Sequence, residues 1–385
     1  MNAPLRVGLL WHAFGHANLG IDALTRAHAG ILKGIARGIG RDVRFVTLGS
    51  VGPEDALPAG VEAGGHLSLR EALRGRSRFI ATVRRCDVVF DIGEGDSFTD
   101  LYGPARFIRQ MMTKIAVLHG GVPLVLAPQT IGPFDNPLCR LLAGQVLRRA
   151  DAVFARDRLS AEYAQGLSGR GVSEVTDLAF ALDCRPAARG FGRIGVNVSG
   201  LLWNGLLRVG CDYRTLMLGT IAALAQRGEV HLIAHVNGQV GADTDEKVAD
   251  ELAGQFPQTV RAPRFADAVA AKSYIAGMDF MVAARMHAAI AALSSGVPVV
   301  PLAYSRKVNG LFDSLNYGGF VDLRATPEHD ALATILDAFA RQEELAALAA
   351  TANERARSWL DQYRQAIQPI LARAAAPKER MHEPA

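Results

Sequence analysis

The sequence is poor in cysteine. It holds four cysteines among 385 residues, Cys86, Cys139, Cys184 and Cys211, and their spacing matches neither a metal-binding nor a redox motif. No metal site is therefore predicted. Unpaired, scattered cysteines are typical of a protein that stays in a reducing cytosol.

The chain also lacks a long uninterrupted apolar segment. Near the N-terminus only Val7 to Trp11 is apolar before His12, which is too short for the core of a signal peptide. Residues 286–305 carry no formal charge, but Ser294 to Pro298 interrupts them with a helix stop and a turn. We therefore predict no transmembrane span and a cytoplasmic location.

The chain also lacks a long run of charge of one sign. The 42 Lys and Arg residues exceed the 38 Asp and Glu residues by only four, and no basic run is long enough for a nucleic-acid tail. Nucleic acid is not an expected partner. The mild positive excess suits anionic small molecules or an anionic lipid surface, which leaves peripheral association with the inner face of the membrane open.

What the chain does contain is the pattern of an α/β protein. Apolar residues make up 49% of it, enough to bury a sizeable core, and short apolar runs alternate with segments of helical periodicity. Such alternation predicts mostly parallel sheets covered by helices. The segment 184–192 has linker composition, so we predict two Rossmann-like domains that face each other across a cleft.

The domain boundaries follow from this pattern. Residues 1–188 are predicted to form the N-terminal domain and residues 189–350 the C-terminal domain. A long Ala-rich helical segment then closes the chain, and its part 351–375 is expected to pack back on the N-terminal domain. The tail, 376–385, is expected to be frayed.

Cationic side chains follow two neighbouring strands of the predicted C-terminal sheet. The strand Phe280 to Ala283 stops just before Arg285 and His287, and the next strand, Val297 to Tyr304, stops just before Lys307. Open α/β sheets bind ligands at the carboxyl ends of their strands. A solvated Arg or a structural His is the alternative for any one of them, but three such groups at adjacent strand ends favour a site.

The N-terminal half carries three further candidates at strand ends. Asn18 follows the first strand, where it either binds a ligand or caps a helix, and Arg156 repeats the placement of Arg285. After the strand 87–92 comes an acidic glycine loop that contains Glu94, Gly95 and Asp96. Its glycines let the backbone approach a ligand, and its carboxylates suit sugar hydroxyls or a general base. For Asp96, helix capping is an equal alternative.

Six short motifs follow the strands in a fixed order. They are Asn18-Leu19-Gly20, Gly93-Glu94-Gly95-Asp96, Ala127-Pro128-Gln129-Thr130-Ile131-Gly132-Pro133, Arg156-Asp157-Arg158-Leu159-Ser160, Arg285-Met286-His287 and Tyr304-Ser305-Arg306-Lys307. With these motifs the chain resembles the polysaccharide pyruvyl transferase family from about residue 5 to about residue 322. It departs from the family pattern in two places. Glu94 occupies the middle of the family's glycine triplet, and the acid that usually follows the first loop is displaced to Asp22.

The resemblance implies a fold of the GT-B glycosyltransferase type and transfer of an enolpyruvyl unit from phosphoenolpyruvate to a sugar. The unit closes as a ketal across two hydroxyls of a glycan or lipid-linked saccharide. Donor-binding roles are implied for Arg285 and Lys307 in the C-terminal domain, with Arg156 contributing from the N-terminal domain. Acceptor-binding roles for Asn18, Glu94 and Gly95 lie on the N-terminal side. Phosphoenolpyruvate is the donor substrate, and no further cofactor is implied.

The chemistry of this transfer requires a proton for the methylene carbon of the donor and a base for the attacking hydroxyl. His287 suits these catalytic roles because histidine side chains in general exchange protons near neutral pH, and Asp96 suits them as a carboxylate. The sequence leaves open which is the acid. The arginines suit bidentate holding of carboxylate and phosphate, and Lys307 suits a compact phosphate contact.

Two other functions stay open on the same architecture, because a fold does not fix the chemistry. A sugar-nucleotide glycosyltransferase needs similar cations for a diphosphate and a carboxylate for ribose hydroxyls, and the C-terminal half offers Asp243, Asp245, Glu246 and Asp313. A catalytically silent glycan-binding protein of a polysaccharide locus is favoured if Glu94 has displaced the reactive geometry.

Overall fold

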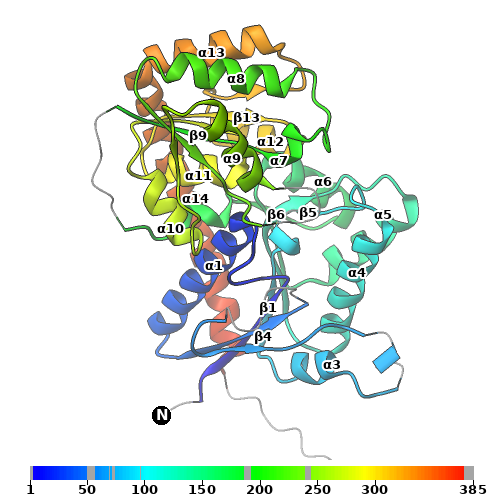
Figure 1. Ribbon diagram of the computed structural model, residues 1–385. Helices are drawn as coiled ribbons and strands as arrows, with labels where there is room; N and C mark the ends of the chain where they lie inside the picture. The colour runs from blue at the N-terminus through cyan, green and yellow to red at the C-terminus, as the bar shows by residue number, and fades with distance from the viewer. Residues whose placement is uncertain are drawn as a thin grey trace, which may run out of the picture.

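The computed structural model describes residues 3–49, 57–68, 70–71, 74–95, 97–185, 192–238 and 244–376. Its strands form two parallel sheets, one in each half of the chain (Figure 1). The predicted α/β class with two Rossmann-like domains is confirmed. The boundary predicted near residue 188, the acid Asp96 and the tail 377–385 all fall outside the described residues.

The N-terminal sheet has the strand order β3-β2-β1-β4-β6-β7-β8, with β5 paired to β6. Its strands are β1 (Leu5–Leu10), β2 (Val43–Leu48), β3 (Val61–Ala63), β4 (Val88–Asp91), β5 (Ser97–Phe98), β6 (Leu124–Ile131), β7 (Ala152–Ala155) and β8 (Ser173–Glu174). The helices around it are α1 (Leu19–Gly38), α3 (Arg78–Val83), α4 (Pro104–His119), α5 (Pro137–Arg149) and α6 (Arg158–Ser168), with the 3-10 turns η2 (Gly93–Gly95) and η3 (Leu178–Ala181). The central strands β1 and β4 are apolar and almost wholly buried, as strands covered on both faces must be.

The C-terminal sheet has the strand order β11-β10-β9-β12-β13-β14. Its strands are β9 (Arg193–Asn197), β10 (Glu229–Ile233), β11 (Val260–Arg261), β12 (Phe280–Ala283), β13 (Val299–Ala303) and β14 (Val321–Asp322). Around it lie α7 (Gly200–Trp203), α8 (Tyr213–Leu224), α9 (Asp245–Gln255), α10 (Ala268–Ile275), α11 (Met286–Ser294), α12 (Arg306–Ser314) and α13 (Glu328–Ala340). The strand order reverses between β9 and β12, and such reversals open a crevice at the carboxyl ends of the strands.

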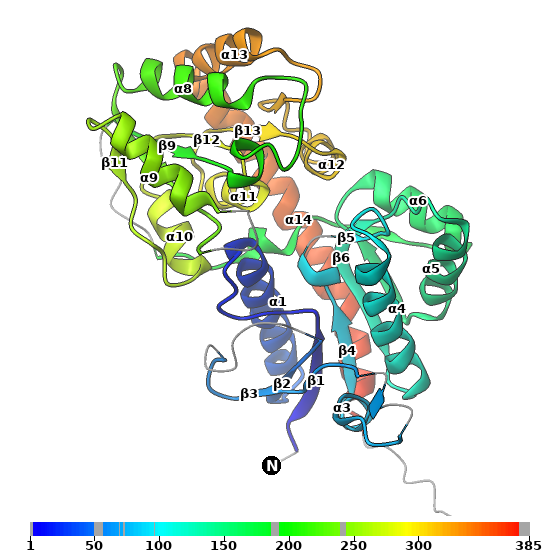
Figure 2. The same cartoon turned by 45° about the vertical axis from the view of Figure 1, so that its right-hand side comes forward.

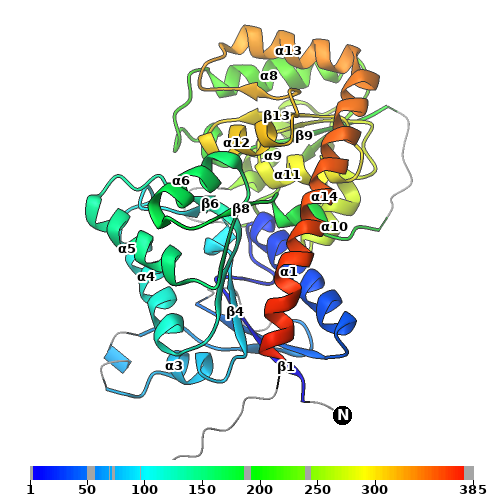
Figure 3. The same cartoon turned by 180° about the vertical axis from the view of Figure 1, so that it is seen from behind.

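The last helix, α14 (Gln342–Ala374), runs from the C-terminal half to the N-terminal half (Figure 3). In its later turns it packs on α1, where the Tyr363 hydroxyl lies 2.9 Å from His28 Nε2. His28 Nδ1 in turn lies 2.9 Å from His12 Nε2, and His12 Nδ1 lies 3.0 Å from the Leu10 carbonyl. Because a carbonyl only accepts, His12 Nδ1 carries the proton, His28 donates to His12, and Tyr363 donates to His28. This buried chain of hydrogen bonds ties α14 to β1.

The two halves meet at the carboxyl ends of their sheets. Asn18, just after β1, forms an antiparallel bridge with Val236, just after β10. The Leu19 N–H donates to the His235 carbonyl at 3.1 Å, and the Asn237 N–H donates to the Ala17 carbonyl at 2.8 Å. The strand ends predicted to carry the site therefore lie against each other.

Candidate active site

The first turn of α1 lies at the centre of the site and contacts residues of both domains. Asn18 caps this helix, and its Oδ1 accepts the Gly20 N–H at 3.0 Å. The capping alternative thus describes the geometry of Asn18, and its acceptor-binding role stays a prediction. Gly20 faces the C-terminal domain, where a Cβ on this residue would lie 2.2 Å from His287 Nδ1. Only glycine at this position lets the imidazole lie so close to the helix.

His287 is held between the two domains. It lies in the first turn of α11, its side chain is only 12% exposed, and its Nε2 lies 3.6 Å from Asp177 Oδ2. In the described part of the chain this Nε2 atom has no hydrogen-bond partner, although it is buried. A buried, unpartnered ring nitrogen beside a carboxylate is available to hold or move a proton.

Asp177 is the functional candidate that sequence reasoning missed. It caps η3, and its Oδ2 accepts a hydrogen bond of 3.1 Å from Nη1 of Arg156, which is itself 1% exposed. Burial alone would raise the pKa of Asp177, but the facing His287 and Arg156 outweigh burial and lower it to about 2. The carboxylate is therefore ionised at neutral pH. The only sequence signal was an acid directly after a short strand.

Arg156 reaches the site from the end of β7, as its sequence position predicted. Its Nε donates to Thr130 Oγ1 at 2.8 Å, and its Nη1 donates to Asp177. The residue thus joins the ends of β6 and β7 to the carboxylate beside His287. Its role in holding the donor stays a prediction.

Arg285 lies behind His287 and is bound to an acid. Its Nη2 donates to Asp245 Oδ1 at 2.6 Å, and its Nε lies 3.2 Å from both carboxylate oxygens. Asp245 also accepts the backbone N–H groups of Gly200 and Val236, at 2.8 and 2.9 Å. One edge of the guanidinium is therefore occupied within the C-terminal domain. The predicted grip of Arg285 on a donor anion stays a prediction.

The acidic glycine loop also lies against the first turn of α1. Gly93, Glu94 and Gly95 all have positive φ angles, of 61°, 62° and 72°. A Cβ on Gly93 would lie 2.3 Å from Gln129 Oε1, and a Cβ on Gly95 would lie 2.7 Å from Ile21 Cγ1, so both positions require glycine. The loop therefore packs its backbone on the first turn of α1, close to the turn that His287 contacts.

Glu94 adopts a left-handed conformation that glycine adopts at much lower cost. Its carboxylate accepts a hydrogen bond of 2.8 Å from Arg106 Nε, which directs it toward α4. Below the loop, Lys114 Nζ and Asp91 Oδ2 form a wholly buried ion pair at 3.1 Å, and Asp91 also accepts the Gly93 N–H. The loop is thus anchored from below, and the acceptor-binding roles of Glu94 and Gly95 stay predictions.

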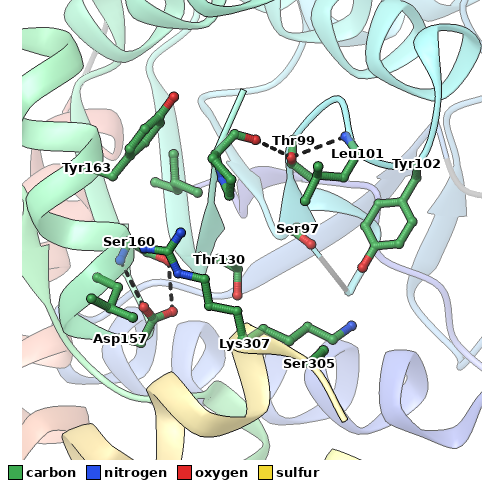
Figure 4. Close-up of a pocket in the computed structure, with 15 residues that line it drawn as sticks. Ser97, Thr99, Leu101, Tyr102, Thr130, Asp157, Ser160, Tyr163, Ser305 and Lys307 are labelled. Carbon is green, nitrogen blue, oxygen red and sulfur yellow. Dashed lines mark hydrogen bonds between the residues drawn. The ribbon is translucent and has the colours of Figure 1, made fainter. Parts of the chain in front are cut away.

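A cavity of about 160 Å³ lies between the halves, next to this loop. Lys307 and Ser305 line it from the C-terminal half, and the residues on its other side, from the N-terminal half, include Ser97, Thr130 and Tyr163 (Figure 4). Thr130 is also the hydrogen-bond partner of Arg156. Lys307 and Arg306 bring positive charge to the cavity wall, which suits an anionic ligand.

Across the residues that the structure describes, no three His, Cys, Asp or Glu side chains gather where they could hold a metal ion. In the same residues no helix combines the length and the apolar character that crossing a bilayer requires.

Comparisons with known proteins agree with the sequence motifs. The family model of polysaccharide pyruvyl transferase matches residues 18–306, a range that contains most of the predicted site residues. The amylovoran biosynthesis protein AmsJ of Erwinia amylovora is 23% identical over 304 residues, which cover 73% of this chain and 72% of AmsJ.

Solved structures show the same fold at low sequence identity. A putative UDP-N-acetylglucosamine 2-epimerase from Listeria monocytogenes has a TM-score of 0.59 and 13% identity, with 96% of this chain and 98% of that chain covered. Anabaena Alr3699/HepE in complex with UDP and glucose has a TM-score of 0.58 and 14% identity, with 96% and 99% covered. These likenesses confirm the predicted GT-B-like fold.

Proposed function

This chain belongs to the polysaccharide pyruvyl transferase family, and from that premise we propose that it moves the enolpyruvyl group of phosphoenolpyruvate onto a sugar of a glycan or lipid-linked saccharide. The product is a pyruvate ketal across two hydroxyls. The observation that supports this proposal most is the placement of cations at the strand ends of both domains. Lys307 lines the cavity between the halves, and Arg156 donates to Thr130, which lines the same cavity, and to Asp177, which faces His287.

Each of these side chains has a role in the proposed transfer. Lys307 and Arg156 hold the phosphate and carboxylate of the donor. His287 gives a proton to the methylene carbon, which becomes a methyl group and leaves the neighbouring carbon electron-poor. In its charged form the imidazole faces the ionised Asp177, whose negative charge stabilises it.

Two sugar hydroxyls complete the reaction. The first attacks the electron-poor carbon, the C–O bond to phosphate breaks, and the second hydroxyl closes the ring. Of the two hydroxyl protons, one replaces the proton that His287 gave and the other leaves with the phosphate, so the atoms balance. With His287 as the acid, Asp96 is the candidate for the base that receives a hydroxyl proton.

The sugar-nucleotide alternative loses one of its supports in this geometry. Asp245, a candidate partner for ribose hydroxyls, is wholly buried and already binds Arg285 and backbone N–H groups. Glu246 accepts the Gly238 N–H, and Asp243 lies outside the described residues.

The test compares two donors. The purified protein is incubated with a mixture of glycan acceptors and either phosphoenolpyruvate or a set of sugar nucleotides, and the release of phosphate or nucleoside diphosphate is measured. Acceptor-dependent phosphate release is expected, together with its loss in His287→Ala by about 10²- to 10⁴-fold. Release of nucleoside diphosphate instead would show a glycosyltransferase, and release of neither product would favour a silent binding protein.

A further inference from the structure

The exposed apolar side chains of this protein gather on one face. Six of the ten large hydrophobic side chains that are exposed in the described residues lie on α5, on the first two turns of α4 or in the loop just before α4. They are Leu101, Tyr102, Ile108, Leu138, Leu141 and Leu142, and together we call them the outer face. Exposed apolar residues that cluster in this way usually mark an interaction surface.

The members of the outer face lie close together in space. The Asp100 carboxylate accepts the N–H groups of Asp135 and Asn136, at 3.1 and 2.9 Å, which fixes the loop before α4 against the start of α5. The two helices pack against each other along the outer edge of the N-terminal domain (Figure 2), on the opposite side of that domain from α1 and α14 (Figure 3). The elements that carry the outer face are therefore held together, and the described residues leave its six side chains exposed.

The two helices of the outer face carry charge of one sign. Helices α4 and α5 contain six basic residues and no acidic residue. Four of the bases, Arg109, Arg140, Arg148 and Arg149, are exposed. The acids nearby, Asp100 and Asp135, lie in the loops before the helices, and the Asp100 carboxylate already binds two backbone N–H groups. Exposed leucines among arginines complement a binding partner that has an apolar interior and a negatively charged exterior.

We propose that the outer face docks on an anionic lipid bilayer. Leucine side chains bury at the boundary of headgroups and acyl chains, while arginines pair with anionic headgroups. Leu101 and Tyr102 also line the cavity that Lys307 reaches from the other domain. A membrane on this face would therefore lie beside the cavity entrance, where a sugar carried on a membrane lipid can enter. This last step rests on the proposed function, whereas the docking itself does not.

The docking is tested by flotation of the full-length protein with vesicles, without any donor or acceptor. Vesicles of phosphatidylcholine alone are compared with vesicles that also contain phosphatidylglycerol, each at low and at high salt. Binding is expected to the anionic vesicles and to weaken with salt. Leu138→Ser together with Leu141→Ser should weaken it by at least about tenfold per leucine. Arg109→Gln together with Arg140→Gln should weaken it by about 5-fold per charge.

The controls use the same chemistry elsewhere on the molecule. Leu138 and Leu141 are 62% and 57% exposed, so their loss should leave the folded state intact. Leu206 and Leu348, 50% and 46% exposed, lie off the outer face, and Leu206→Ser with Leu348→Ser should bind vesicles like the parent protein. Equal flotation of the parent and the Leu138/Leu141 variant would overturn the proposal. So would a parent dimer that this variant converts to a monomer, because the outer face would then be covered by a second copy.

The proposed function is tested independently of the docking surface. Phosphate release with a water-soluble saccharide acceptor requires no membrane, and the Leu138/Leu141 variant should retain it. A protein that floats with anionic vesicles but releases no phosphate from phosphoenolpyruvate would keep the docking surface and lose the proposed reaction. A protein that releases phosphate from phosphoenolpyruvate but does not float with anionic vesicles would keep the proposed reaction and lose the docking surface.

Discussion

A methyl group at position 20 should separate catalysis from folding. In Gly20→Ala the new Cβ would lie 2.2 Å from Nδ1 and 2.7 Å from Cγ of His287, whereas real Cβ atoms essentially never approach closer than 3.0 Å. The imidazole must therefore move by about 0.8 Å or more, or the two domains must part. Misplacement of a catalytic group by about 1 Å can lower the rate about 10²-fold. We expect turnover of phosphoenolpyruvate to fall by about that factor.

The stability of the same variant should change little. Alanine is favoured over glycine inside a helix by up to about 1 kcal/mol, which offsets part of the strain at His287. The matched control is Gly30→Ala, in the same helix, because Gly30 is exposed and a Cβ there would meet no atom within 4 Å. The control should gain up to about 1 kcal/mol in the free energy of unfolding and keep its turnover. Full turnover in Gly20→Ala, measured by phosphate release, would show that catalysis does not need His287 where it lies against α1.

Three further predictions concern buried or strained groups. Asp177→Asn removes the buried carboxylate that pairs with the buried Arg156, so the free energy of unfolding should fall by about 3–5 kcal/mol in urea denaturation; an unchanged value would mean that the pair is dispensable. Glu94→Gly and Glu94→Ala lose the same ion pair, but only glycine relieves the positive φ angle, so the glycine variant should be the more stable by about 1 kcal/mol, and equal stability would contradict this strain. Burial lowers the pKa of His12 to about 3 and that of His28 well below its usual 6.5, so the unfolded state binds more protons below pH 6.5. The free energy of unfolding should therefore fall as the pH drops from about 6.5 toward 3, by up to about 1.4 kcal/mol per pH unit for each histidine, and a flat pH profile would contradict the buried neutral pair.

The architecture could be predicted from the sequence because the spacing of apolar residues within each segment indicates whether it forms a strand or a helix. Alternating apolar runs and helical segments predicted two parallel sheets, and parallel sheets place the carboxyl ends of their strands at one edge. The positions of Arg156 and His287 follow from that rule alone. The long helical segment predicted at the end of the chain is α14, whose periodicity is long and regular.

The pairings inside the site could not be predicted in this way. Asp245 binds Arg285 across 40 residues of sequence. Asp177 and His287 belong to different domains and meet only where the two domains pack against each other. Neither contact leaves a local signal. The left-handed backbone at Glu94 was equally hidden, because glutamate rarely adopts it and only the glycines on either side hinted at a tight turn.

The fate of the donor carbon distinguishes transfer of a pyruvyl group from transfer of a sugar most directly. The parent protein would be incubated with carbon-13-labelled phosphoenolpyruvate and a glycan acceptor, and the product analysed by NMR. Our account predicts one labelled quaternary ketal carbon bound to two sugar oxygens, with one phosphate released for each ketal formed, and no such carbon with His287→Ala. A product that carries no label, while the parent transfers sugar from a nucleotide donor to the same acceptor, would contradict it.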